Sequence, residues 1–385
     1  MDYSLNEQQK MMRSLARQIA EEKILPVRAE YDEKEIFPWD VVKALSEAGL
    51  FGVFIPEEYG GLGGGNFDLC LVVEELSRVC GGIALAYAAT ALGATPIIEA
   101  GSDELKKRYL PRIADGTIAA FGLTEAEAGS DAAATKASAV KADDGSYIVN
   151  GTKRFISNGG DAEIYSIIAM TDKTKGPRGA TALVVDKDTP GFTFGKKEKK
   201  MGIRANSTRE LVYDDCKIPS ENLIGKEGYG FIIAMKTLDK SRAPVGSQAV
   251  GIAQGAFEAS VAHARERKQF DKPLASLQAI SHMLADMGTQ IEAARALVYA
   301  AARHIDTGAK HITEEGSMAK LFASEVAMRV TTDAVQIHGG IGYMRDFPIE
   351  KMMRDAKITQ IYEGTSQILK NDIAPQILKR RGLRQ

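Results

Sequence analysis

Over roughly the first 120 residues, apolar positions recur with the period of amphipathic helices. Met11, Leu15 and Ile19 fall on one helix face, and Ser4 is of the residue type that caps a helix N-terminus. The same period predicts further helices at 39–50, 68–79, 83–98 and 106–113. The segment 83–98 is almost wholly apolar and small, so it is expected to be buried.

Between about residues 121 and 225 the pattern changes to short runs rich in β-branched and aromatic residues, separated by turn residues. These runs predict strands at 138–142, 147–149, 164–170, 180–185 and 210–212. Asp144-Gly145 is predicted to lie in a turn, and Asn150-Gly151 is predicted to form a hairpin. The segment is therefore expected to form an all-β domain.

From residue 230 onward, the helical period returns over the spans 232–267, 277–305 and 314–336. Pro244 lies inside the first span and is expected to kink or interrupt it, because proline lacks the N–H that a helix interior needs. The order of elements predicts an α+β protein. Its expected parts are an N-terminal α-helical domain (1–120), a middle β-barrel or β-sandwich domain (121–225) and a C-terminal four-helix bundle (226–385).

Composition narrows the class of protein. The chain has 385 residues, more than one ordinary core accommodates. A formal net charge of -2 gives no drive toward nucleic acid or acidic membranes, and the basic end at 379–384 is interpreted as a solvated tail. No stretch is expected to reach the ~20 apolar residues that span a bilayer, and the N-terminal sequence lacks the pattern of a signal or transit peptide. The dispersed cysteines and histidines predict reduced thiols, a cytoplasmic protein and no metal site.

Six segments combine glycines or charges with aromatic or hydroxyl side chains: 121–131 (FGLTEAEAGSD), 153–160 (KRFISNGG), 238–242 (LDKSR), 265–273 (RERKQFDKP), 336–343 (QIHGGIGY) and 354–367 (RDAKITQIYEGTSQ). Several have ordinary structural readings, such as a β-turn for the first or a helix end carrying cations for the fourth. The third is interpreted as a charged cluster facing out of a helix of small residues. The first is not a GxGxxG motif and no GxxxxGK[ST] is present, so neither a Rossmann nor a P-loop nucleotide site is supported.

Glu363 is the candidate general base. It follows Ile361 and Tyr362 and precedes Gly364, where the chain can bend and the carboxylate can point into a cavity. Apolar surroundings would raise the pKa of this carboxyl toward what a base at neutral pH needs. A glutamate before a glycine is more often a surface turn residue, so the pattern alone leaves both interpretations open.

Taken together and in this order, the six segments resemble the acyl-CoA dehydrogenase family over essentially the whole chain. The most specific matches are LTEAEAGSD, RKQFDKPL, QIHGGIGY and IYEGTSQI. The resemblance implies the helical, β and helical domain order, non-covalently bound FAD, and a homotetramer (a dimer of dimers) in which each FAD touches a neighbouring subunit. It also implies dehydrogenation of an acyl-CoA thioester to a trans-2-enoyl-CoA, with electron-transferring flavoprotein as the electron acceptor.

The resemblance implies roles for individual residues. FAD contacts are expected from Phe121, Leu123, Thr124, Phe155, Ser157, Gln336, Gly340, Thr365 and Gln367, and from Arg267, Phe270 and Gln278 of a neighbouring subunit. Substrate contacts are expected from Ser130, Asp239, Arg242, Tyr362 and Gly364. Glu363 corresponds to the family's base, which removes the α-proton while the β-hydrogen leaves as hydride to flavin N5. Some relatives carry the base just before the arginine of the LDxxR segment, where this chain has Ser241, so Glu363 has no visible competitor.

The acyl group is less well defined by the sequence. The segments 192–202 and RDAKITQIYEGT are similar to bacterial short-chain (butyryl-CoA type) dehydrogenases, while branched and cyclic thioesters stay open. Dicarboxylyl thioesters are disfavoured because 83–98, the expected pocket wall, contains no Arg or Lys. The alternatives are an acyl-CoA oxidase or an enoyl-CoA reductase on the same fold, and a non-catalytic acyl-CoA-binding protein.

Overall fold

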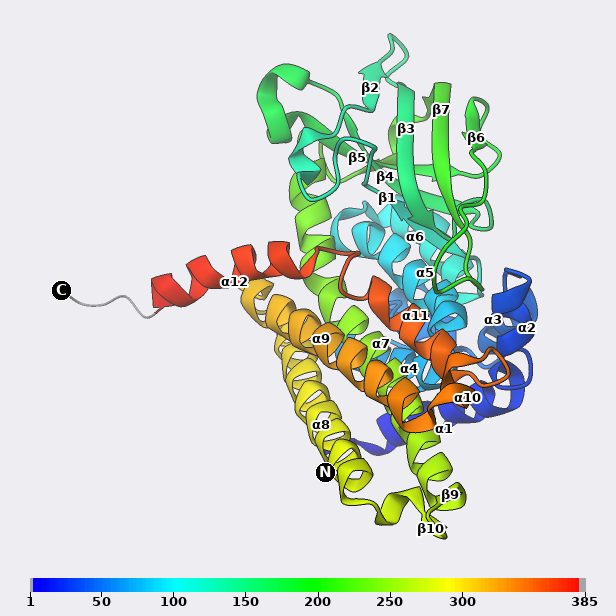
Figure 1. Cartoon of the computed structure of the whole chain (residues 1–385). Coiled ribbons are helices and arrows are strands. Elements are labelled where there is room, and N and C mark those ends of the chain that lie inside the picture. Colours follow the sequence, from blue (N-terminus) through cyan, green and yellow to red (C-terminus); the bar gives the residue numbers. More distant parts are fainter. Residues whose placement is uncertain (1–2, 381–385) are drawn as a thin grey trace, which may run out of the picture.

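The computed structural model describes residues 3–380, so residues 381–384 of the predicted basic tail lie outside the described part. Figure 1 shows a helical N-terminal unit, a β-sheet and a second helical unit, in that order along the chain. This order confirms the predicted α+β fold class. The exact domain boundaries stay predictions.

The N-terminal unit is built from six α-helices. They are α1 (Glu7–Ile19), α2 (Arg28–Glu33), α3 (Trp39–Glu47), α4 (Asn66–Val79), α5 (Gly81–Ala100) and α6 (Asp103–Ala114). The prediction that Ser4 caps the first helix is wrong. Asn6 is the cap: its side chain accepts a hydrogen bond from Gln9 N at 2.8 Å, and the Gln9 side chain accepts one from Asn6 N at 3.1 Å. Ser4 lies too far ahead of the first helical turn to reach its free N–H groups.

Helix α5 is the buried centre of this unit, as the apolar segment 83–98 predicted. The expectation that no stretch is long and apolar enough to cross a bilayer is wrong, because the 20 residues of α5 meet that criterion. However, 78% of its most apolar window is buried inside the protein. A core helix passes the same test, so the match carries little weight.

The middle unit is an eight-stranded sheet in the order β6-β7-β3-β2-β4-β5-β8, with β1 paired to β4. The strands are β1 (Ala119–Gly122), β2 (Ser138–Lys141), β3 (Tyr147–Ser157), β4 (Ile164–Met170), β5 (Ala180–Asp186), β6 (Phe192–Phe194), β7 (Thr208–Ile218) and β8 (Leu223–Ile224). Strands β1 and β2 pair with β4 in parallel, and the other pairs are antiparallel.

The hairpin predicted at Asn150-Gly151 is absent, because β3 runs straight through both residues. The pairing of β3 with β7 shifts register between Val149 and Gly151, which is a β-bulge. The side chain of Asn150 donates to Asp215 Oδ1 at 3.0 Å and accepts from Asp215 N at 2.8 Å, so the neighbouring strand satisfies the asparagine. The turn that joins β2 to β3 lies at Asp144-Gly145, as predicted, with Gly145 at φ +83°.

The C-terminal unit consists of α7 (Gly230–Glu266), α8 (Gln278–Asp306), α9 (Thr313–His338), α10 (Gly340–Tyr343), α11 (Ile349–Ile358) and α12 (Ser366–Arg380). A two-stranded hairpin, β9 (Lys268–Gln269) and β10 (Lys272–Pro273), projects beyond the end of α7 (Figure 1).

Pro244 lies inside α7 without interrupting it, so of the two predicted effects the interruption is absent and the kink stays a prediction. A proline inside a helix leaves the carbonyl four residues earlier without its N–H donor. Here that carbonyl belongs to Lys240, and it accepts a hydrogen bond from the Asn66 side chain at 2.8 Å. The backbone N–H groups of Asn66 and Phe67 in turn donate to Asp306 at 2.6 and 2.9 Å, so the start of α4 is joined to both α7 and α8.

Candidate active site

A cavity of about 430 Å³ lies where α5, α7, the segment after β1, the end of β3 and the turn at 362–364 meet. Its apolar walls come mainly from two helices. They comprise Leu85, Ala88, Ala89, Leu92 and Thr95 of α5 and Phe231, Met235, Leu238 and Val245 of α7. These positions follow the helical period, so each helix turns one apolar face toward the cavity. The expectation that 83–98 forms a pocket wall is thereby confirmed.

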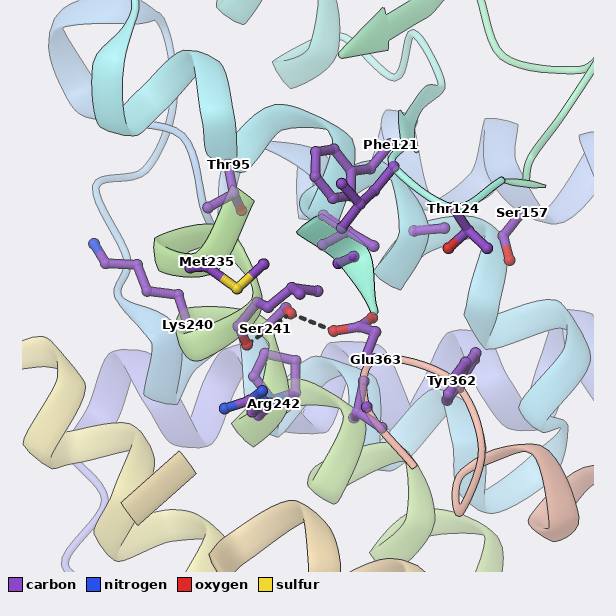
Figure 2. Close-up of a pocket in the computed structure, with 18 of the residues that line it drawn as sticks. Thr95, Phe121, Thr124, Ser157, Met235, Lys240, Ser241, Arg242, Tyr362 and Glu363 are labelled. Carbon is purple, nitrogen blue, oxygen red and sulfur yellow. Dashed lines mark hydrogen bonds between the residues drawn. The ribbon is translucent and has the colours of Figure 1, made fainter. Parts of the chain in front are cut away.

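Glu363 lies in a turn with its side chain directed at the cavity (Figure 2). Its backbone adopts φ +52° and Gly364 follows at φ +100°, two successive residues in a region where only glycine is unstrained. The Ser241 hydroxyl of α7 donates a hydrogen bond to Glu363 Oε2. The turn therefore presents the carboxylate between the apolar walls.

Burial raises the pKa of Glu363 to about 7, while the Ser241 hydrogen bond and the charges of Lys320 and Arg242 oppose that rise. The Ser241 hydroxyl also lies 3.1 Å from the carbonyl oxygen of Leu238. A hydroxyl has one proton and two lone pairs, so it can donate to the carboxylate or accept from the protonated acid while donating to Leu238. Glu363 is thus placed to gain and lose a proton near neutral pH.

Arg242 does not face outward, contrary to the prediction for the 238–242 cluster. It is only 5% exposed, and its Nη1 donates to Asp239 Oδ1 at 3.0 Å and to Ser317 Oγ at 2.8 Å. Its Nη2 forms an ion pair with Asp372 at 2.9 Å. Nε of Arg242 is buried without a hydrogen-bond partner among the described residues.

A second group of expected residues lines the same cavity from the sheet side: Phe121, Leu123, Thr124, Phe155 and Ser157. Phe155 is 58% exposed at φ +59°, an unusual position for an aromatic side chain that has no ligand role. Arg154 N donates to Thr124 O at 2.7 Å, which brings the end of β3 against the segment after β1. Within the described residues, no hydrogen bond occupies the Thr124 or Ser157 hydroxyl. An open aromatic face beside free hydroxyls suits a flat heteroaromatic ring with polar edges.

A buried ion pair supports this side of the cavity, and sequence reasoning missed it. Lys153 Nζ donates to Glu125 Oε1 at 2.7 Å, to Thr135 Oγ1 at 2.8 Å and to Leu123 O at 3.1 Å. Burial opposes ionisation of Glu125, but the charge of Lys153 and the hydrogen bonds to the carboxylate hold its pKa below the ordinary value. The pair fixes the segment that carries Thr124. No local sequence pattern marked it, because its partners are 18 to 30 residues apart.

The expected substrate-contact residues Ser130, Arg242, Tyr362 and Gly364 also line the cavity, and Asp239 lies behind Arg242. Seven of the expected flavin contacts do not line it: Arg267, Phe270, Gln278, Gln336, Gly340, Thr365 and Gln367. Phe270 is 85% exposed at the tip of the β9–β10 hairpin, well away from the cavity. The resemblance assigned Arg267, Phe270 and Gln278 to a neighbouring subunit, so their roles stay predictions.

Comparison with known proteins gives the same picture across the whole chain. Family models match at residues 6–117 (acyl-CoA dehydrogenase, N-terminal domain), 120–216 (middle domain) and 228–378 (C-terminal domain). The chain is 49% identical over 382 residues to acryloyl-CoA reductase (NADH) of Anaerotignum propionicum, covering 99% of this chain and 97% of that protein. It is 48% identical over 381 residues to a short-chain specific acyl-CoA dehydrogenase of Clostridium acetobutylicum, covering 98% of this chain and 100% of that protein.

Solved structures agree with these relatives. Butyryl-CoA dehydrogenase from Megasphaera elsdenii superposes with a TM-score of 0.95 at 46% identity, covering 98% of this chain and 100% of that one. A chain from work on the electron transferring flavoprotein of Acidaminococcus fermentans gives 0.96 at 48% identity, with the same coverage. An acyl-CoA dehydrogenase from Bacillus anthracis complexed with FAD gives 0.91 at 34% identity, covering 98% of this chain and 68% of that one.

Proposed function

The chain belongs to the acyl-CoA dehydrogenase family, and we propose that it interconverts a short-chain acyl-CoA and its trans-2-enoyl-CoA with Glu363 as the α-proton base. FAD is the cofactor. The observation that carries the proposal is the Glu363 carboxylate, which is directed into a largely apolar cavity and has a pKa raised to about 7.

In the dehydrogenase direction, Glu363 takes the α-proton of the bound thioester. FAD, when bound here, would supply the redox chemistry at the β-carbon as the acceptor of a hydride. Phe121, Leu123, Thr124, Phe155 and Ser157 would hold the flavin ring, since they offer an aromatic face and free hydroxyls on the side of the cavity opposite α7. The α- and β-hydrogens leave as a proton and a hydride, so the acyl chain gains one double bond and electrons balance.

The thioester carbonyl must be stabilised while the α-carbon loses its proton. The backbone N–H of Glu363 donates to no acceptor among the described residues, so it is available to that carbonyl. Glu363 lines the cavity from its left-handed turn, so this N–H and the carboxylate belong to the same lining residue. One residue would then supply both the base and a hydrogen-bond donor.

Two polar side chains support a short acyl group. Tyr362 donates its hydroxyl proton to Gln248, and the Gln248 amide donates to the Gly81 carbonyl at 3.0 Å. Both side chains line the cavity, and Tyr362 packs against the apolar cluster of Leu85. These bonded side chains limit the room for an acyl chain on this side of the cavity, where one methylene is worth ~1–3 kcal/mol of discrimination.

Electron-transferring flavoprotein is the proposed electron acceptor. Its support is the likeness to a chain from the Acidaminococcus fermentans flavoprotein work. The likeness to an acryloyl-CoA reductase favours a second candidate direction, reduction of a short 2-enoyl-CoA. A carboxyl with a pKa of about 7 serves either direction, since it can accept or return the α-proton.

The test is an anaerobic titration of the FAD-loaded protein with butyryl-, octanoyl-, isobutyryl- and glutaryl-CoA, following the flavin absorbance. Butyryl-CoA is expected to bleach the flavin fastest. Glu363→Gln is expected to retain FAD and thioester binding but to reduce about 10²–10⁴-fold more slowly, while Glu363→Asp keeps a carboxylate and part of the rate. Near-normal reduction in Glu363→Gln would contradict the assignment of the base. If the acyl-CoA thioesters leave the wild-type flavin oxidised, whereas a 2-enoyl-CoA reoxidises the reduced flavin, the result would favour the reductase direction.

A further inference from the structure

Lys320 is a buried charge to which the proposed reaction gives no role. It lies on α9, is 0% exposed and does not line the cavity. It forms no salt bridge with any other residue of the described range 3–380 at 4.0 Å or less. Its Nζ instead donates to the backbone carbonyl of Gly364 at 2.6 Å. A buried ammonium normally has a carboxylate partner, so this one requires an explanation.

The bonded carbonyl belongs to the turn that carries the base. Glu363 and Gly364 have φ of +52° and +100°, and a Cβ at Gly364 would lie 3.2 Å from the Leu369 side chain. A non-glycine residue in this region persists only when its surroundings hold it there. Lys320 holds the carbonyl that leaves the turn, and Glu325, also on α9, accepts from the Ser366 hydroxyl at 2.7 Å. Helix α9 therefore holds the turn at the Gly364 carbonyl and the following start of α12 at Ser366.

The charge of Lys320 also acts on the base. The charged groups that face it are Glu363 on the turn, Arg242 on α7 and Glu325 on α9. Burial lowers the pKa of Lys320 to about 8, and Glu363 is the first charge that opposes this effect. Arg242 is largely neutralised, since it pairs with Asp239 and Asp372. Lys320 in turn lowers the pKa of Glu363.

We propose that Lys320 is a positioning residue for the base: it fixes the left-handed turn through the Gly364 carbonyl and supplies a buried positive charge that favours the ionised form of the Glu363 carboxylate. The inference rests on the proposed role of Glu363. It deepens that role by stating what allows a desolvated carboxylate to act as a base. Burial disfavours the carboxylate, and the Ser241 hydrogen bond, the charge of Lys320 and the charge of Arg242 together oppose that effect.

The test compares Lys320→Met, which keeps the length of the side chain and removes the charge, with Lys320→Arg, which keeps a charge. Lys43→Met, which removes an exposed lysine on α3, is the control. The rate of flavin reduction by saturating butyryl-CoA is measured anaerobically from pH 5.5 to 9.5. Loss of a cation disfavours the ionised carboxylate. The midpoint of the acid limb, the low-pH side of the rate profile, is therefore expected to rise by about one pH unit in Lys320→Met. A midpoint moved from 7 to 8 leaves about fivefold less active base at pH 7, and the rate recovers at high pH.

Lys320→Arg and Lys43→Met are expected to keep the acid limb of the wild type. A Lys320→Met profile lowered equally at every pH, with its midpoint unmoved, would overturn the proposal, since that is the effect of a structural role alone. If Lys320→Met loses its flavin, Lys320→Arg decides: an unmoved midpoint supports the proposal, and a midpoint raised by a unit overturns it. Failure of the base assignment is a separate result, because Glu363→Gln would then reduce its flavin normally while these profiles were unaffected.

Discussion

Lys153 and Lys320 are both 0% exposed, yet they lie in opposite electrostatic surroundings on two sides of one cavity. On the sheet side, Lys153 has a carboxylate of its own, Glu125, at 2.7 Å. On the helical side, the partner of the Lys320 ammonium within residues 3–380 is a backbone carbonyl, and the charge of this lysine influences the carboxylate of the base. The paired lysine is positioned to stabilise a segment, whereas the unpaired one is positioned to change the protonation of a neighbour.

Each carboxylate also has one hydroxyl partner, which makes the comparison sharper. Thr135 donates to Glu125 and accepts from Lys153, so both sides of its hydroxyl are used by the ion pair. Ser241 donates to Glu363 and lies within reach of a backbone carbonyl. Substitutions on the sheet side should therefore change stability, and substitutions on the helical side should change the pH dependence of the reaction.

The largest effect is expected from Lys153→Met. It leaves the Glu125 carboxylate buried without its cation, which costs about 3–5 kcal/mol of unfolding free energy. Urea unfolding measures this cost, and flavin retention reports on the Thr124 segment. The double variant Lys153→Met/Glu125→Leu removes both charges and should recover most of the loss. If Lys153→Met lost less than about 1 kcal/mol of unfolding free energy, the ion pair would not be structural and the contrast between the two lysines would fail.

A smaller effect on the same side is expected from Thr135→Val, which keeps the shape of the side chain and removes its hydroxyl. Two hydrogen bonds of the buried pair are lost, so the unfolding free energy should fall by about 1–2 kcal/mol. The pH profile of flavin reduction should keep its midpoint, as measured by stopped flow in the same buffers. A moved midpoint would mean that the sheet-side pair also acts on the base.

The smallest effect is expected from Ser241→Ala, on the helical side. The hydroxyl lowers the pKa of Glu363, so its removal should raise the acid limb of the profile. The hydroxyl can also accept from the protonated acid, so the shift should be only about half a pH unit, or a twofold loss of rate at pH 7. Ser241→Thr keeps the hydroxyl and should match the wild type. Unfolding free energy should change little, and a large loss there would contradict the division between the two sides.

The sequence predicted the elements that depend on local pattern and missed those that depend on distant partners. Helical periodicity located α5 and α7, and the motif around Glu363 located the candidate base. The hairpin at Asn150-Gly151 was wrong because Asp215, on another strand, satisfies the asparagine. Arg242 was placed outward because its ion-pair partner, Asp372, is 130 residues away in the sequence. Lys153 and Lys320 carried no signal, since a lysine in a periodic segment is ordinarily a surface residue.

The hydrogen bonds that join the start of α4 to α7 and α8, referred to as the α4 joint, have a consequence for the order of folding steps. The donors and acceptors of the α4 joint lie 174 residues apart between Asn66 and Lys240, and 240 residues apart between Asn66 and Asp306. During synthesis, the N-terminal helices emerge long before those acceptors exist. The first free N–H groups of α4 must therefore be satisfied by water until most of the chain has left the ribosome. Loop closure over such spans is slow, so the closing of this joint belongs among the last steps of folding.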